Sequence, residues 1–299
     1  YILIYMDIIC DGDSWTFGCE LVSKEVELKY GEPGKHVGAY DFFQENDEYR
    51  TNVAWPEKLR EIINGRAINL SFPADDNTTI LNRTISYVSS QYLAKGKSTD
   101  DLLVIVGWSS PERTSFWYKD DDINIKHRLQ PNTEHFDSKK QEEFFRLYVE
   151  HYWHAEEYIP RFVMNALQLQ NFCESNNIKY LQYNSFYQSP NLNPQQWIDM
   201  DVSLELNKLH VGGYVTTNKS ERTSYDFDYK SIWDTINPVT FYKKNETNNT
   251  FINFIQNNCK EPFTGWHPSI EGHEVWANEL YRYMIENKII DKSPRLLCE

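Results

Sequence analysis

The sequence contains no run of about 20 apolar residues, the length that a helix needs to cross a bilayer, so no membrane span is expected. It also lacks a strong basic cluster, because 30 Lys and Arg face 44 Asp and Glu and the formal net charge is −14. Binding of phosphates depends on Lys and Arg, so a nucleic-acid partner is not expected. Cysteine is scarce: the five residues include no CxxC pair, which favours free thiols in a reducing compartment such as the cytoplasm over a zinc site.

What the sequence does contain is enough apolar material for a large core, since 40% of its 299 residues are hydrophobic and 15% are aromatic. Apolar segments of strand length alternate with segments of helical periodicity. This alternation predicts a three-layer α/β/α sandwich with a parallel, flavodoxin-like sheet, formed by a single domain over residues 1–299. The strands are predicted at 2–9, 66–72, 101–108 and 178–184, and the helices at 53–65, 75–96, 139–176 and within 267–289.

Two of the strand predictions depend on local features. Residues 101–108 form a continuous apolar run, which is typical of a strand buried on both faces of a parallel sheet. Residues 2–9 are also apolar, but no basic segment precedes them and no small-residue cleavage site follows. We therefore interpret this stretch as a strand and not as a signal peptide.

Two segments interrupt the alternation, at about 109–137 and 214–249. Insertions of this length in a compact domain usually serve as lids, binding surfaces or partner contacts. Trp117, in the first insertion, could stack on a sugar ring as a substrate-binding residue, or pack the insertion onto the core.

The chemically informative residues follow the predicted strands. In a parallel α/β sheet, ligands bind at the carboxyl ends of the strands. Ser14 follows the first strand in the stretch ICDGDSWTFG, and His267 comes shortly before the last helix, in GWHPSIEGH. An imidazole can take the proton of a serine hydroxyl, and the N–H groups of a tight turn can bind the resulting oxyanion. Taken alone, Ser14 would be a helix cap and His267 a surface residue, but their joint placement favours a catalytic pair.

The segments that carry these residues resemble the conserved blocks of the SGNH/GDSL hydrolase family. GDSWTFG is similar to the first block and HPSIEGHEVWANEL to the last, while INLSFPADDN and LLVIVGWSSPER match the second and third in position. The style is closest to the divergent SGNH proteins of phages and other large DNA viruses. The resemblance implies that Ser14 is the nucleophile and His267 the base, and that the backbone N–H groups of Ser14 and Ala74 bind the oxyanion.

Three positions depart from the family pattern. Ala74 stands where the family has a glycine, and Ser109 stands where it has an asparagine that helps bind the oxyanion. Asn77 could replace that asparagine, or it could cap the following helix. Thr264 stands where the family has the acid that orients the histidine. Three alternatives remain open: a backbone carbonyl orients His267, another carboxylate arrives from elsewhere in the fold, or the site is weak or inactive.

Three further residues near these blocks, Arg113, Asp13 and His273, are candidates for structural or binding roles. Arg113 is either a surface ion-pair partner or a substrate-binding clamp for an anionic group. Asp13 is interpreted as a structural hydrogen-bonding residue and His273 as a structural residue at the start of a helix. The pair His151 and His154 could bind a metal on one helix face, although polar surface contacts are favoured because no further ligands complete the site.

The sequence thus predicts a serine esterase of SGNH type that needs no cofactor or metal and removes O-acyl groups, in the first place acetyl, from a carbohydrate or a small ester. An acyltransferase using the same residues is a close variant. The alternative is a catalytically decayed viral structural or glycan-binding protein, which would be associated with virion proteins or form a homo-oligomer.

Overall fold

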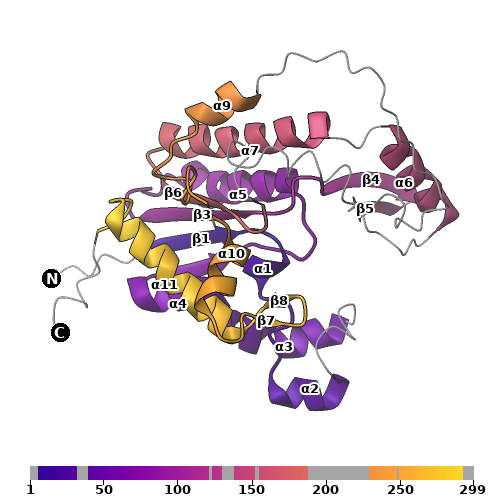
Figure 1. Ribbon diagram of the computed structural model, residues 1–299, viewed down its shortest axis with the longest axis horizontal. Helices are drawn as coiled ribbons and strands as arrows, with labels where there is room; N and C mark the ends of the chain where they lie inside the picture. Colours follow the sequence, from indigo (N-terminus) through magenta and orange to yellow (C-terminus); the bar gives the residue numbers. More distant parts are fainter. Residues whose placement is uncertain are drawn as a thin grey trace.

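The centre of the protein is a parallel sheet of four strands, seen in a computed structural model (Figure 1). The model describes residues 6–31, 40–120, 123–129, 138–151, 155–187, 229–247 and 249–291. The strand order is β2-β1-β3-β6 and every neighbouring pair is parallel. The strands are β1 (Asp7–Asp11), β2 (Arg66–Asn69), β3 (Leu102–Trp108) and β6 (Lys179–Asn184). The predicted parallel sheet is therefore confirmed, although its first strand continues two residues beyond the predicted end.

Helices cover both faces of this sheet, which makes the three layers of the predicted sandwich (Figure 1). The helices α5 (Asn77–Gln91), α7 (Ala155–Ser175) and α9 (Tyr229–Thr235) lie on one face. The helices α4 (Trp55–Ile63), α10 (Phe251–Asn258) and α11 (Ile270–Glu286) lie on the other. A short 3₁₀ helix (Leu93–Lys95) follows α5 and ends at Gly96, as the sequence indicated.

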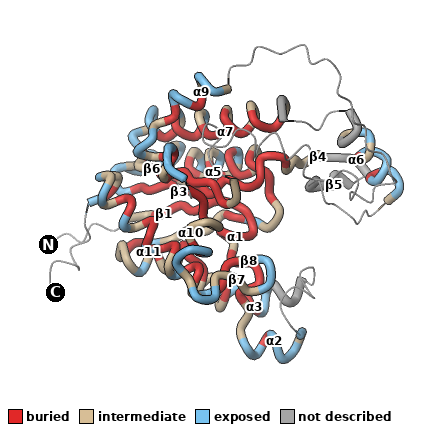
Figure 2. Tube along the Cα trace, viewed as in Figure 1, coloured by how far each residue is buried: buried red, intermediate tan, exposed pale blue. Residues whose placement is uncertain are grey.

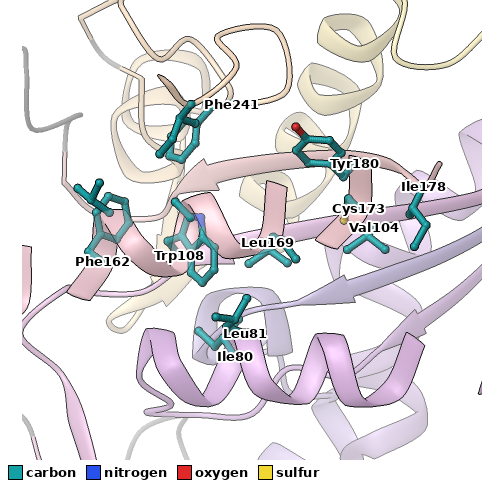
Figure 3. Close-up of a cluster of buried hydrophobic side chains, with 14 of the residues drawn as sticks. Ile80, Leu81, Val104, Trp108, Phe162, Leu169, Cys173, Ile178, Tyr180 and Phe241 are labelled. Atoms are coloured by element: carbon teal, nitrogen blue, oxygen red, sulfur yellow. The ribbon is translucent and has the colours of Figure 1, made fainter. Parts of the chain in front are cut away.

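Alternation along the strands divides the core into two clusters. Val104 and Trp108 of β3 pack with the α5 and α7 side, where Leu81 and Phe162 meet them (Figure 3). Leu103, the neighbour of Val104, faces α4 and α11 instead. All seven residues of β3 are buried because both faces are covered, and Figure 2 shows the central strands buried between the helices.

Two of these helices begin at a residue whose side chain caps them. The carboxylate of Asp76 accepts the backbone N–H of Thr79 at 3.0 Å and so caps α5. The hydroxyl of Ser269 accepts the N–H of Gly272 at 3.1 Å and caps α11. Each cap satisfies a backbone donor that has no partner inside its helix. These caps fix the starts of two helices that border the carboxyl edge of the sheet.

The helical predictions are confirmed over one long segment and incomplete elsewhere. The region predicted as a helix over 139–176 is helical in its described parts, α6 (Lys139–His151) and α7, while residues 152–154 lie outside the described part. Two helices, α2 (Lys24–Tyr30) and α3 (Tyr40–Val53), were not predicted. Charged and polar residues dominate both sequences, so no apolar periodicity marked them.

The first expected insertion contains its own hairpin. The strands β4 (Thr114–Asp120) and β5 (Ile123–Leu129) pair antiparallel. Phe116 of β4 contacts Phe144 and Tyr148 of α6 edge-to-face, with ring centroids 4.9 and 5.0 Å apart. The insertion is therefore an arm of a hairpin packed on a helix, which Figure 1 shows extending from one end of the sandwich.

The second expected insertion, 214–249, differs from the prediction over its described part. Its residues 229–247 form α9 and a segment whose aromatic side chains Trp233, Phe241 and Tyr242 are fully buried. Phe241 also bridges Gln182 of β6 in parallel. The buried aromatic residues of this segment belong to the core, while other residues in it are exposed and residues 214–228 lie outside the described residues. Among the helices that are described, none is both long and apolar enough to span a membrane.

Candidate active site

Ser14 begins a one-turn helix directly after the central strand β1. The helix α1 (Ser14–Phe17) is capped by Asp13, whose Oδ1 accepts the N–H of Trp15 at 3.0 Å. A Cβ on Gly12 would lie 2.3 Å from Oγ1 of Thr16, so only glycine lets the turn close this tightly. As the first helical residue, Ser14 has a backbone N–H with no acceptor inside its helix, and the residue is only 7% exposed.

His267 reaches the same region from the other end of the chain. It lies in a tight hairpin of β7 (Phe263–Thr264) and β8 (His267–Pro268), joined by Gly265 and Trp266. The strand β8 lies against α1, which Figure 1 shows beside the hairpin. The two segments that the sequence singled out, whose residues Ser14 and His267 are 253 positions apart, therefore meet at the carboxyl edge of the sheet.

A carboxylate that the sequence did not single out lies beside the imidazole. Oε2 of Glu20 is 3.1 Å from Nδ1 of His267, and it accepts the backbone N–H of Trp266 at 2.8 Å. Glu20 follows Ser14 by six residues, in the turn after α1. No pattern in the sequence indicates this pairing, except that the expected acid at position 264 is a threonine.

The Ala74 turn is attached to the turn of Ser14. The N–H of Phe72 donates to the carbonyl of Gly12 at 3.3 Å, and Ala74 itself has a φ of 61°. That left-handed conformation favours glycine, so alanine is held there against its own preference. The position expected to carry a glycine does adopt a backbone that glycine favours, with an N–H still available to donate.

Asp13, which precedes Ser14 in the chain, forms a closed triangle of contacts with Ser109 and Arg113. Oγ of Ser109 donates to Oδ2 of Asp13 at 2.7 Å, and Nη1 of Arg113 contacts Oδ2 at 2.9 Å and the serine hydroxyl at 2.7 Å. Asp13 is fully buried, whereas the side chain of Arg113 is 16% exposed. Asp13 is thus the structural residue that the sequence predicted, and Arg113 pairs with a buried carboxylate instead of a surface one.

This triangle bears on the expected oxyanion donors. The single hydroxyl proton of Ser109 is directed to Asp13, so this hydroxyl has no second proton to donate to an oxyanion. The amide of Asn77 accepts the N–H of Ser109 at 2.7 Å and donates to its carbonyl at 3.1 Å. Asn77 therefore ties α5 to the end of β3, and Asp76, not Asn77, is the helix cap. The bond to the carbonyl of Ser109 uses one of the two N–H groups of the Asn77 amide, so the other can donate to a ligand.

The remaining predicted residues lie further out or outside the described part. Trp117 lies in β4 opposite Lys126, and its side chain is outside the described residues. The side chain of His151 and all of His154 also lie outside the described residues. The hypothesis that this pair binds a metal therefore falls outside the described part of the structure. Across the part of the chain that the structure does describe, no group of three or more His, Cys, Asp or Glu is arranged to hold a metal ion.

His273, close to the site, has a structural role. Its Nδ1 accepts the backbone N–H of Trp55 at 3.1 Å, and the residue is fully buried in the first turn of α11. Burial, with a smaller contribution from the charge of His267, lowers the pKa of His273 to about 3. The imidazole is therefore neutral in the folded protein and joins α11 to the start of α4.

We expect His273 to make the protein less stable in mild acid. Between the unfolded pKa of about 6.5 and the lower folded pKa, the unfolded chain binds a proton that the folded protein does not. The free energy of unfolding should then fall by about 1.4 kcal/mol per pH unit below pH 6.5 from this one group. Urea unfolding of the wild type and of His273→Asn, which keeps an acceptor for Trp55, measures the difference. Equal pH dependences in the two proteins would contradict this.

The fold and the site together define an α/β sandwich with a serine and a histidine at the carboxyl edge of its parallel sheet. The chain belongs to a family of unknown function, DUF6071, whose model matches residues 43–205. The match includes Ala74, Asn77, Ser109 and Arg113 but ends before His267 and begins after Ser14. No curated protein matches the chain in sequence.

Solved structures similar to this chain include hydrolases. The psychrotrophic esterase EstA from Pseudoalteromonas sp. is 11% identical, with 94% of this chain and 97% of that chain covered and a TM-score of 0.42. The lipase Lip_vut3 from a goat rumen metagenome is 12% identical, and the match covers 93% of this chain and 97% of the lipase with a TM-score of 0.40. A carbohydrate esterase is 11% identical, and the match covers 94% of this chain and 65% of the esterase chain with a TM-score of 0.43. Similarity at this level assigns neither a substrate nor catalytic residues, which must be argued from the site.

Proposed function

We propose that this protein is a serine esterase of SGNH type that removes O-acyl groups, in the first place acetyl groups, from a carbohydrate. The observation that carries the proposal is the packing of β8, with His267, against the one-turn helix that begins at Ser14. A serine at a helix start has free backbone donors around it, and an imidazole next to it can act as its base.

The reaction follows from these groups. Oγ of Ser14 attacks the acyl carbon while Nε2 of His267 takes the hydroxyl proton, and the ester carbonyl becomes an oxyanion. The N–H groups of Ser14 and Ala74 donate to that oxyanion, with Asn77 offering its remaining N–H. When the tetrahedral intermediate collapses, His267 returns the proton to the leaving alcohol. A water molecule activated by His267 then hydrolyses the acyl-serine and releases the acid.

The substrate class is argued from the rim of the site. Trp266 is next to His267 in the chain and 86% exposed, although tryptophan is usually largely buried. An exposed indole beside a catalytic base offers a flat apolar face on which a sugar ring can stack. Arg113, paired with Asp13, adds a cation at the same edge that an acyl or carboxylate oxygen can approach.

We expect Ser14→Ala to abolish hydrolysis of p-nitrophenyl acetate and labelling by a fluorophosphonate probe, with a loss of about 1,000-fold or more in kcat. Ser71→Ala serves as the matched control, because Ser71 is equally buried at the same sheet edge and bonds Asn69. Release of acetate from an O-acetylated oligosaccharide tests the substrate class. The glycan-binding alternative would be favoured by a different result. In that case both the wild type and Ser14→Ala would hydrolyse p-nitrophenyl acetate only at the background rate, and both would still bind the oligosaccharide.

A further inference from the structure

The carboxylate of Glu20 is held in place by three partners on the His267 hairpin. Its Oε2 lies 3.1 Å from Nδ1 of His267 and accepts the N–H of Trp266 at 2.8 Å. The backbone N–H of His267 also interacts with this carboxylate. The side chain of Glu20 is only 4% exposed, so water does not compete strongly for these contacts.

We propose that Glu20 is the acid that orients His267. The acid of this site then comes from the turn that follows Ser14, and not from position 264. The proposal rests on the function proposed above. A carboxylate oxygen 3.1 Å from Nδ1 favours the tautomer with its proton on Nδ1, although the ring N–H is not aligned with that oxygen as a hydrogen bond in this structure. Nε2 is then the unprotonated nitrogen, which is the one that must accept the Ser14 proton. When that proton arrives, the positive imidazolium lies beside the negative carboxylate, and Glu20 itself gains no proton.

The charge state of Glu20 fits this role. Burial alone would raise its pKa, but the contacts with His267 and with the backbone N–H groups of Trp266 and His267 outweigh burial and lower it. Glu20 is therefore ionised throughout the pH range in which His267 would act as a base.

The hairpin is shaped to admit this carboxylate. A Cβ on Gly265 would lie 2.3 Å from Oε2 of Glu20, and Gly265 has a φ of 59°, so glycine leaves room for the carboxylate and adopts a backbone conformation that it favours. Glu20 is itself held at a φ of 65°, an uncommon backbone conformation for a side chain of this size. Both the residue that supplies the carboxylate and the glycine packed against it therefore have a left-handed backbone conformation.

The position that would otherwise supply an acid remains within reach of the histidine. Thr264 pairs directly opposite His267 in the hairpin, so the two side chains project from the same face about 5 Å apart. An aspartate placed at position 264 could therefore contact the imidazole in place of Glu20. This geometry makes an exchange of the acid between the two positions a feasible experiment.

The experiment compares Glu20→Gln with Glu271→Gln. The amide of Glu20→Gln can donate to Nδ1 and so favour the tautomer with its proton on Nε2, which cannot accept the Ser14 proton. We expect kcat for p-nitrophenyl acetate to fall about 100- to 10,000-fold while KM changes little. Glu271 also accepts two backbone N–H groups near this hairpin, from Lys260 at 3.2 Å and Glu261 at 3.0 Å, but it does not face His267. Its glutamine variant should keep wild-type kcat.

Two further measurements separate orientation from folding. The double variant Glu20→Gln with Thr264→Asp should recover at least about tenfold of the lost kcat, which a purely structural role for Glu20 would not allow. In proton NMR, the Nδ1–H of His267, assigned by its absence in His267→Gln, should appear downfield in the wild type and in Ser14→Ala but not in Glu20→Gln.

The outcomes distinguish this inference from the proposed function. Wild-type kcat in Glu20→Gln, or a downfield resonance that persists in it, would overturn the role of Glu20 even if Ser14→Ala is inactive. If the wild type hydrolyses no ester while the resonance disappears only in Glu20→Gln, the proposed function fails and the pairing of Glu20 with His267 stands.

Discussion

Replacing His267 by Gln is expected to lower kcat for p-nitrophenyl acetate by about 1,000-fold or more and to slow fluorophosphonate labelling of Ser14 in parallel. The reason is that a serine hydroxyl is a weak nucleophile unless a neighbouring base takes its proton. In the proposed reaction this base is Nε2 of His267, a residue that the packing of β8 on α1 brings to this edge of the sheet. A glutamine of similar size keeps the hairpin contacts but offers no base.

The control for this variant is His273→Asn, six residues further along the same segment. His273 is fully buried and bonds the backbone of Trp55, so its loss should change stability and leave kcat near the wild-type value. If His267→Gln retains wild-type turnover, or if both histidine variants lose it equally, His267 is not the base. The esterase proposal would then give way to the glycan-binding alternative.

The parts of the fold that could be predicted are those in which hydrophobic pattern decides the structure. The strand over 102–108 is buried on both faces, so it appears in the sequence as an uninterrupted apolar run. The helix α5 combines an aspartate cap, apolar residues at helical spacing and Gly96 shortly after its end. In such segments the local sequence and the tertiary packing favour the same structure.

The parts that could not be predicted depend on neighbours that the sequence does not reveal. One contact of the α3 helix that no local pattern indicates is that of Arg50, which lies over the ring of Phe17. Trp233 and Phe241 lie in a segment rich in polar residues and nevertheless fill the core beside α7. Local pattern predicts elements well, but it does not state which distant segment will cover them.

The candidate site shows the same division. The motifs around Ser14 and His267 could be recognised because turn residues surround each of them in the chain. Glu20 could not, because its contact with His267 depends on how a turn and a hairpin 245 residues away pack together, and neither Thr264 at the expected acid position nor Gly265 beside it points to position 20. An acid that orients a catalytic histidine is defined by position in space, which a sequence motif captures only where the acid is local.

Replacing Arg83 by Met should destabilise the protein by about 3–5 kcal/mol at neutral pH, because it leaves two buried carboxylates without their shared cation. Arg83 bridges Asp11 at the end of β1 and Asp75 beside Ala74, and it donates to the carbonyl of Gly12 at 3.2 Å. Both aspartates are fully buried. This cluster therefore joins the turn before Ser14 to the turn that holds Ala74.

The loss should depend on pH with a definite sign. Burial raises the pKa of Asp11 to about 6, although Arg83, Thr84 and the N–H of Gly12 lower it in part. Without Arg83 the folded pKa rises further above the unfolded value of about 3.9, so the ionised carboxyl is disfavoured in the folded protein. The deficit of Arg83→Met is then largest at pH 8 and shrinks as the pH falls toward 5 and Asp11 becomes protonated.

Arg66→Met is the matched control for this experiment. Arg66 pairs with Asp7 at the other end of β1, at 2.9 and 2.7 Å, but its side chain is 51% exposed, so its loss should cost at most about 1 kcal/mol. Urea unfolding of the three proteins at pH 5 and pH 8 measures both effects. If the two arginine variants lose equal stability, or if the deficit of Arg83→Met is independent of pH, the buried carboxylates do not need Arg83. The two turns of the site would then be held together by other contacts, such as the backbone bond from Phe72 to Gly12 and the bond from the Asn69 amide to the carbonyl of Thr16.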